Sequence, residues 1–396
     1  MIWTPAKAVF FASNRLLSMN AKISSDAITA LKQLDTHLNP AWQLGRNAIL
    51  AWTAVRTGLK VAVIPVRELL QLLVGQPELL QGPRFLDEAR FTELCRSARL
   101  EAIDIITSLR VGPQEGSVPW QTVEGIIKRY SITETPHRAV MLFDIVGYSK
   151  LDPLHQIGQL NSLEYCINVA HRRLLGWGVK VDLARSTTGD GFYVWNRTVG
   201  LAAEASLLIL LLMVLAENEL ERAQERHGLV PLLRACFSVG RHYAYYQIEG
   251  LSPRGYDYIV GDVTISLARL IGKTETGQLL IGDFERPKSE GGSDMIATPA
   301  FVSQTDKYFR KLIGREFNGV PISDVGLSLT AGPDRKPEKL VIGDKHGLRH
   351  SAYNAVARIY RGGQIPIMLG ASGDNSAGGR ASTAESIVAE IAAAAR

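Results

Sequence analysis

The sequence has few of the features that define several common protein classes. It contains only three cysteines in 396 residues, and no two of them form a C-x-x-C pair. Neither a disulfide framework nor a cysteine-based zinc site is therefore expected. The sequence also lacks a P-loop signature and any signature of a nucleic-acid-binding module, so no nucleic-acid partner is expected. The sparse cysteines favour a reducing compartment, and we expect a cytoplasmic protein.

A strong charge of one sign is also missing. The 44 Lys and Arg residues exceed the 39 Asp and Glu residues by five, and the surplus is spread along the chain. This balance is compatible with an anionic ligand such as a nucleotide but does not require one. The N-terminal segment lacks an apolar core followed by small residues, so a secretory signal is not expected.

No apolar run is both long and free of charges. Residues 47–75 are apolar but are interrupted by Arg56, Lys60, Arg67 and Glu68. We expect a packed pair of helices there, with contact to a membrane surface as the less favoured alternative. Residues 205–216 are uninterrupted but fall short of the roughly 20 residues that span a bilayer, so a buried helix is predicted.

The order of the predicted elements indicates an α+β fold. Residues 1–130 are expected to form a mostly helical region of unknown role. From residue 139 the pattern predicts a strand, a helix, a hairpin, a helix, two strands, a helix and a strand, with a further strand pair near 338–361. Helices on one face of a mainly antiparallel sheet would satisfy this order. The composition of residues 370–396 is typical of a disordered tail.

Two acidic residues stand where strands are predicted to end. Asp144 closes the apolar run of FDIVGYS, in which Gly147 permits a tight turn that can present backbone N–H groups to a phosphate. Asp190 lies between Gly189 and Gly191 in the turn of the predicted hairpin. If the two strands are neighbours, both carboxylates can hold Mg²⁺ or Mn²⁺ together with substrate phosphates. Two such ions can assist an in-line displacement at phosphorus.

A third motif supplies a cation. The segment YDYIVGDVTISLARL places Arg269 two turns into a helix that is predicted to begin near Asp262. A guanidinium in that position can stabilise charge that develops on a transferring phosphorus. Each motif alone is more typical of an ordinary turn or a solvated helix, but the three together favour a catalytic site.

These motifs resemble those of class III nucleotidyl cyclases, whose catalytic domain would correspond to residues 137–368. The resemblance implies a ferredoxin-like core and a homodimer with active sites at the interface. It implies that Asp144, Asp190 and the carbonyl of Ile145 bind two divalent cations, Mg²⁺ or Mn²⁺. The triphosphate would lie against Val146, Gly147, Tyr148 and Ser149, and Arg269 would act on the site of the other protomer.

The sequence departs from the family at the positions that read a purine. Ser186 replaces the adenine-binding Lys, Tyr258 replaces its Asp partner, and Ile265 replaces the ribose-orienting Asn. This pattern is similar to that of the pyrimidine cyclases of the Pycsar anti-phage system, which make cyclic UMP or cyclic CMP and activate an effector. We therefore expect UTP or CTP as substrate, with Tyr148 and Arg185 as candidate base-reading residues. The alternatives to base reading are that Tyr148 packs against the core and that Arg185 is solvated.

Two other functions remain open at this point. One is a divergent adenylate cyclase that makes cyclic AMP from ATP. The other is a non-catalytic module that binds nucleotides or mediates dimerisation. A separate segment, GDKHGLRH, contains Asp344, His346 and His350. A polar turn between two strands is the favoured interpretation of this segment, ahead of a metal site.

Overall fold

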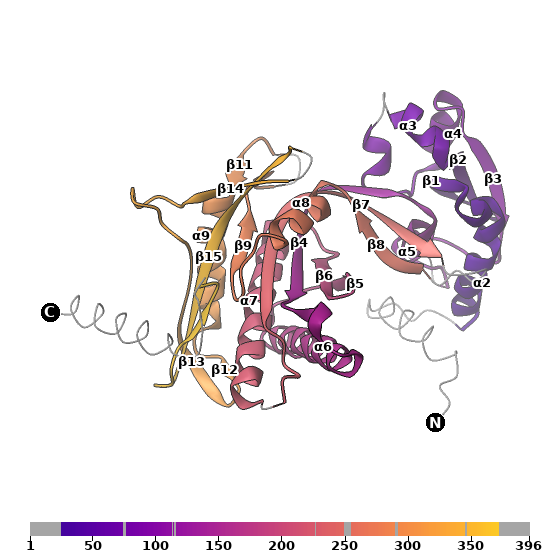
Figure 1. Cartoon of the computed structure of the whole chain (residues 1–396). Helices are drawn as coiled ribbons and strands as arrows, with labels where there is room; N and C mark the ends of the chain where they lie inside the picture. The colour runs from indigo at the N-terminus through magenta and orange to yellow at the C-terminus, as the bar shows by residue number, and fades with distance from the viewer. Residues whose placement is uncertain are drawn as a thin grey trace. The chain divides into compact units, whose positions relative to one another are not determined.

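Two compact units make up the chain in the computed structural model (Figure 1). Unit 1 comprises residues 1–135 and 243–260, and unit 2 comprises residues 136–242 and 261–396. The strands β4 (Thr133–Ile145) and β7 (Leu233–Ile248) contribute residues to both units. The structure describes residues 25–73, 77–112, 114, 116–225, 227–248, 255–289, 292–344 and 347–371. The predicted tail at 370–396 lies almost wholly outside the described residues.

Unit 1 combines helices with a small antiparallel sheet whose strand order is β1-β2-β3. Its core gathers apolar side chains from the sheet and from the first and last helices, including Leu34, Leu38, Trp52, Val61 and Val123. The main elements are α2 (Ser25–Trp42), β1 (Asn47–Val55), β2 (Gly58–Pro65), α3 (Val66–Leu73), α4 (Glu88–Ser97), β3 (Glu101–Ile106) and α5 (Trp120–Ile127).

The helical pair predicted for residues 47–75 is wrong. This stretch forms the β1–β2 hairpin, which pairs Asn47 with Pro65 and Val55 with Gly58, and then α3. Both faces of the two strands are buried over most of their length. Because both faces are buried, the polar alternation that marks a half-exposed strand is missing, and a short apolar run cannot then be told from a helix by its pattern. Within residues 1–130, helices are therefore present around this sheet, but the sheet itself was not predicted.

The elements predicted after residue 139 occur in the predicted order, in unit 2 except for β8 (Gly255–Val260) and the end of β7, and the α+β class is as expected. The large sheet has the strand order β12-β13-β15-β9-β7-β4-β6-β5. Its described neighbours pair antiparallel except β7 and β9, which are parallel. The first elements are β4 (Thr133–Ile145), α6 (Pro153–Gly176), β5 (Leu183–Thr187), β6 (Gly191–Asn196), α7 (Leu201–Gln224), β7 (Leu233–Ile248), β8 (Gly255–Val260), α8 (Asp262–Ile271) and β9 (Leu279–Gly282).

The later elements extend the same sheet and its helical cover. The hairpin β14–β15 falls where the sequence predicts a strand pair, with Lys339 opposite Tyr353. These elements are β10 (Glu285–Pro287), β11 (Met295–Ala297), α9 (Thr298–Phe309), β12 (Glu316–Phe317), β13 (Val320–Leu329), β14 (Lys339–Gly343), β15 (Arg349–Arg361) and β16 (Ile367–Leu369).

The sheet of unit 2 has two differently covered faces. On one face α6, α7 and α9 pack with alternate strand residues such as Met141, Phe143 and Ile145. On the other face α8 lies so close to the strands that a Cβ on Gly240 would come within 3.2 Å of Val263. Strand residues alternate between the two faces. Their position in the alternation therefore decides which helices each side chain meets.

Helix α7 is the buried helix predicted for residues 205–216. Among the described residues it is the one helix whose length and composition would allow it to cross a membrane. However, 78% of its apolar window is buried inside the protein. Such burial is typical of the central helix of a folded core, since a helix that is apolar all round packs in a protein interior as well as in lipid.

His242 is a buried histidine on β7. It is 0% exposed, and neither ring nitrogen has a hydrogen-bond partner among the described residues. Burial, and secondarily the charge of Arg138, lowers the pKa of His242 to about 3. The ring is therefore neutral at pH 7, and protonation in the folded state is disfavoured.

Acid should destabilise the protein through His242. Since the pKa falls from 6.5 in the unfolded chain to about 3 in the folded chain, the unfolded state binds the extra proton between these values. Stability present above pH 6.5 is lost as the pH falls, by up to about 5 kcal/mol. Urea unfolding between pH 7 and pH 4 should show a smaller loss for His242→Phe than for the wild type. The exposed His227, changed to Phe, is the control, and an equal pH dependence for all three proteins would contradict the assignment.

Candidate functional site

The structure brings Asp144 and Asp190 together at the ends of β4 and β6. The two strands pair antiparallel with Asp144 opposite Gly191. The turn between β5 and β6 then returns to β4, where the Ile145 amide donates to the carbonyl of Asp190 at 3.0 Å. Burial is the main reason that the pKa of Asp144 is raised, and the nearby Asp190 raises it further. Two carboxylates from neighbouring strands therefore share one edge of the sheet.

Gly191 allows this close approach. An added Cβ at Gly191 would lie 1.9 Å from the carbonyl oxygen of Phe143, a distance that only a shift of the backbone could relieve. Next to it, Gly189 has φ 101°, a left-handed conformation that glycine adopts without strain. The two glycines predicted to flank Asp190 thus meet two separate steric requirements.

Substituting Gly191 by alanine should separate β4 from β6. We expect a loss of more than about 2 kcal/mol in unfolding free energy, because the clash involves backbone on both sides. Chemical denaturation measures this loss. Gly176→Ala is the matched control, since no atom lies within 4 Å of the Cβ position at Gly176. Equal stability of the two variants would show that the strands do not approach as closely as described.

Arg234 is a site residue that the sequence analysis did not single out. Its Nε donates to Oδ2 of Asp144 at 2.7 Å, and its side chain is 30% exposed. The alternation along β7 could have indicated its orientation, because Leu233, Ala235 and Phe237 form the inward face of the strand and leave Arg234 on the opposite face. That Arg234 meets an acidic partner depends on β7 lying beside β4, which only the tertiary structure decides.

The electrostatics of Asp144 reflect three influences. Burial raises the pKa of Asp144 above its ordinary value and is the largest of them. The hydrogen bond and charge of Arg234 act in the opposite direction, and the charge of Asp190 raises the pKa further. A second cation at this place would relieve the repulsion between the two carboxylates.

The turn after β4 presents free backbone amides. Gly147 adopts φ 75°, and residues Tyr148–Lys150 form one turn of 3₁₀ helix. The amide of Val146 already donates to the carbonyl of Leu232 at 2.9 Å. In the part of the chain that the structure describes, the amides of Gly147, Tyr148 and Ser149 have no backbone acceptor. Three successive amides in such a turn form a site for an anion.

Arg269 pairs with a different carboxylate of the same protomer. Its Nε is 3.4 Å from Oδ2 of Asp344, which lies just beyond β14. Oδ2 of Asp344 is also 3.6 Å from Nε2 of His350. Within the described part of the chain, Arg269 forms no ion pair with Asp144 or Asp190. This placement is compatible with action on the site of a second protomer, which remains a prediction.

The candidate base-reading residues are not gathered in one place. Arg185 pairs with Glu164 and hydrogen-bonds Asn168 of α6, and its guanidinium lies 5.7 Å from the ring centroid of Phe192. Arg185 therefore belongs to the α6 face of the sheet, whereas Asp144, between Phe143 and Ile145, points to the opposite face. The structure does not bring Arg185 to the carboxylates.

The other base-reading positions differ in surroundings. Tyr148 is partly buried against the core of unit 2, which agrees with the packing alternative. Ser186 pairs across β5 and β6 with Tyr193, whose hydroxyl donates to the carbonyl of Thr264 on α8 at 3.1 Å. Ile265 is 50% exposed. Tyr258 lies on β8 in unit 1, opposite Tyr245, and its side chain is outside the described residues.

The residues present fit a pair of hard divalent cations in part. Carboxylate oxygens are the ligands that Mg²⁺ and Mn²⁺ prefer, and these ions commonly take only one or two carboxylates, with waters and substrate phosphates as further ligands. Asp144 and Asp190 supply two, at the ends of neighbouring strands. No group of three or more His, Cys, Asp or Glu side chains among the described residues could hold a metal ion by itself.

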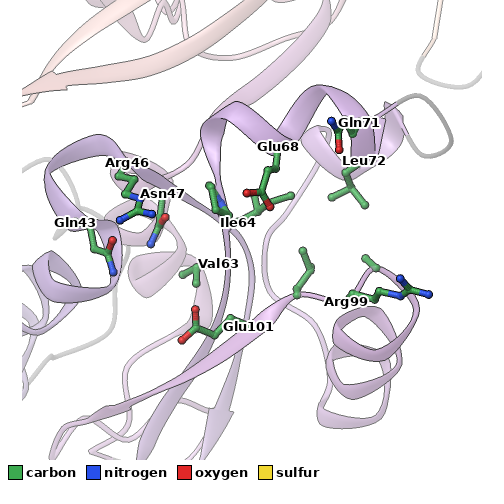
Figure 2. A pocket seen from close by; sticks show the side chains of 13 residues that line it. Gln43, Arg46, Asn47, Val63, Ile64, Glu68, Gln71, Leu72, Arg99 and Glu101 are labelled. Atoms are coloured by element: carbon green, nitrogen blue, oxygen red, sulfur yellow. The ribbon is translucent and has the colours of Figure 1, made fainter.

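A separate cavity of about 630 Å³ opens in unit 1. Figure 2 shows charged side chains of both signs around it, among them Arg46, Glu68, Arg99 and Glu101. Carboxylates and guanidinium groups therefore both line this cavity, and its lining does not favour an anion by charge.

Comparison with known proteins gives similarity in structure but not in sequence. No protein-family model matches the chain, and no curated protein matches it. The chain is similar to solved nucleotidyl cyclases. The guanylyl cyclase Cya2 is 14% identical, with a TM-score of 0.34, over 60% of this chain and 98% of that chain.

Two further solved structures show the same level of similarity. The guanylate cyclase domain of RhGC from Catenaria anguillulae in complex with GTP is 12% identical, with a TM-score of 0.35, over 58% of this chain and 98% of that chain. The adenylyl cyclase CyaB from P. aeruginosa is 16% identical, with a TM-score of 0.30, over 42% of this chain and 93% of that chain. At such low scores the function must be inferred from the site itself.

Proposed function

We propose that this protein is a nucleotidyl cyclase, which converts a nucleoside triphosphate into a 3′,5′-cyclic nucleotide and pyrophosphate. The observation that carries the proposal is the convergence of Asp144 and Asp190 beside a turn with free amides. The order and spacing of the three motifs, which resemble those of class III cyclases, support the same reaction.

The chain's own residues would bind and orient the substrate. The amides of Gly147, Tyr148 and Ser149 would hold phosphate oxygens, and Arg234 would contribute a cation beside them. Asp144, Asp190 and the carbonyl of Ile145 would hold two divalent cations. Bound cations of this kind supply Lewis acidity for the 3′-hydroxyl and neutralise the departing pyrophosphate. The 3′-hydroxyl would lose its proton to solvent, and the 3′-oxygen would bond to the α-phosphorus as the bond to pyrophosphate breaks.

Arg269 would stabilise the negative charge on the α-phosphate during this displacement. In the proposed homodimer, Arg269 of one protomer serves the carboxylate pair of the other. Little covalent chemistry is left to the side chains, so positioning and electrostatics supply the rate.

The favoured substrate is UTP or CTP. Support comes from Ser186 and Tyr258, which replace the residues with which the resembling family reads adenine. A site that has lost hydrogen-bonding partners for one base loses its preference for that base. The product, cyclic UMP or cyclic CMP, would act on a cyclic-nucleotide-responsive effector in the cytoplasm, as the resemblance to anti-phage pyrimidine cyclases suggests.

The direct test is product identification. Purified protein is incubated separately with ATP, GTP, CTP and UTP in the presence of Mn²⁺, and the products are identified by mass spectrometry. Cyclic UMP or cyclic CMP would support the full proposal. Cyclic AMP alone would retain the reaction but overturn the pyrimidine preference. No cyclic product from any of the four triphosphates would overturn the proposed activity and favour a nucleotide-binding module.

A further inference from the structure

The turn beyond β14 holds a buried carboxylate whose role the proposed reaction leaves open. The side chain of Asp344 is 3% exposed. The turn itself fixes this residue, because Oδ1 accepts from the Leu348 amide at 2.9 Å and the Asp344 amide donates to the Leu348 carbonyl at 2.9 Å. The carboxylate therefore has one oxygen committed to the turn and one oxygen, Oδ2, directed elsewhere.

Oδ2 of Asp344 faces two basic side chains. Arg269 Nε lies at 3.4 Å, and His350 Nε2 lies at 3.6 Å. Arg269 is on the last turn of α8, and a long side chain there has several rotatable bonds. The side chain of Arg269 is 36% exposed, but its Nε is buried and has no hydrogen-bond partner among the described residues, so its contact with Asp344 is an ion pair without a hydrogen bond.

We propose that Asp344 is a positioning residue that fixes the guanidinium of Arg269 for the neighbouring active site. The inference rests on the proposed function, since it concerns the arginine of that reaction. A buried carboxylate with fixed orientation limits the rotamers of Arg269 before substrate binds. Such preorganisation reduces the conformational entropy that would otherwise be lost when the transition state forms.

His350 completes the arrangement from β15. Its side chain is 13% exposed, and its Nε2 is the second basic atom near Oδ2 of Asp344, at 3.6 Å. The segment GDKHGLRH is a turn between two strands, as favoured from the sequence, and its acidic residue has a defined partner on α8. His346 lies outside the described residues.

A heterodimer with one working site tests the proposal. One protomer carries Arg269→Ala and keeps its carboxylates, while the other carries Asp190→Asn and keeps Arg269. Adding Asp344→Asn to the protomer that keeps Arg269 should lower kcat by about 10- to 100-fold and leave KM within about 2-fold, as for other residues that orient a catalytic group. The same substitution on the other protomer should add nothing, because its Arg269 is already absent.

The matched control is Asp334→Asn. Asp334 also accepts a backbone hydrogen bond within a turn, from Lys336 at 3.1 Å. Its substitution should leave kcat unchanged on either protomer. An equal loss from Asp344→Asn on both protomers would indicate a merely structural role and overturn the proposal.

A second measurement does not depend on activity. The ¹⁵Nε–H resonance of Arg269, assigned by its absence in Arg269→Lys, should shift and exchange faster with water in Asp344→Asn. An unchanged resonance would overturn the positioning role even in an active enzyme. A shifted resonance in a protein that makes no cyclic nucleotide would instead overturn the proposed function and leave the contact intact.

Discussion

Changing Asp144 or Asp190 to asparagine should abolish cyclic nucleotide formation without unfolding the protein. Each substitution removes a negative oxygen from the proposed cation site, and we expect a loss of at least about 1,000-fold in kcat, since such ions contribute several kcal/mol to the transition state. The measurement is product formation with the preferred triphosphate at saturating Mn²⁺.

The stability of these variants separates a catalytic from a structural role. Because the pKa of Asp144 is raised above its value in the unfolded chain, the folded state favours the neutral form. The stability from this residue is complete at low pH and declines as the pH rises through its folded pKa. Asp144→Asn should therefore leave the melting temperature at pH 7 unchanged or higher.

An exposed aspartate provides the control for both substitutions. Asp294 has an 80% exposed side chain and pairs loosely with Lys288 at 3.6 Å. Asp294→Asn should keep wild-type activity. If either carboxylate variant cyclises its substrate at the wild-type rate, the proposed cation site is wrong.

Arg269→Ala should be inactive alone and regain activity when paired with Asp190→Asn. The guanidinium carries a transition-state charge contact, so we expect a loss of about 100- to 1,000-fold in kcat. In a two-fold dimer with sites shared across the interface, random pairing of the two variants gives about one quarter of the wild-type number of complete sites. Co-expression with two different tags isolates the doubly tagged dimer, in which one of the two sites is complete, so a cyclase assay on it should show about half of the wild-type activity.

Two further variants serve as controls for the complementation test. Arg269→Lys keeps the positive charge but loses the planar fork of donors, so it should recover little activity by itself. A chain that carries both Arg269→Ala and Asp190→Asn should not complement itself. Failure of the mixed dimer to regain activity would show that each site is built within one protomer.

Much of unit 2 could be predicted from the sequence because its signals are local. Leu163, Ile167, Ala170 and Leu174 recur at helical spacing and are all 0% exposed on α6. The glycines around Asp190 mark a turn that returns one strand beside another. Such patterns depend on residues a few positions apart, so the chain's own spacing fixes them. The same argument located both carboxylates at strand ends.

The β1–β2 hairpin shows where this approach fails. A strand buried on both faces has no alternation, and its identity depends on the partner strand that pairs with it. Similarly, no residue near Arg234 in the sequence indicates that it contacts Asp144, and no residue near Arg269 indicates that it contacts Asp344. These pairs join residues 90 and 75 positions apart through the order of strands in the sheet.

The sequence by itself determined the elements from β4 to β9, the hairpin β14–β15 and the places of the two carboxylates at strand ends, because turns, caps and periodic faces are encoded in neighbouring residues; it missed α9 and β13, which the loop-rich composition after residue 285 concealed. Only the tertiary structure decided which charges meet. It paired Asp144 with Arg234, placed Arg185 on the far face and held Arg269 against Asp344. Contacts between distant segments depend on strand order and register, which many sequences with the same local pattern could satisfy differently.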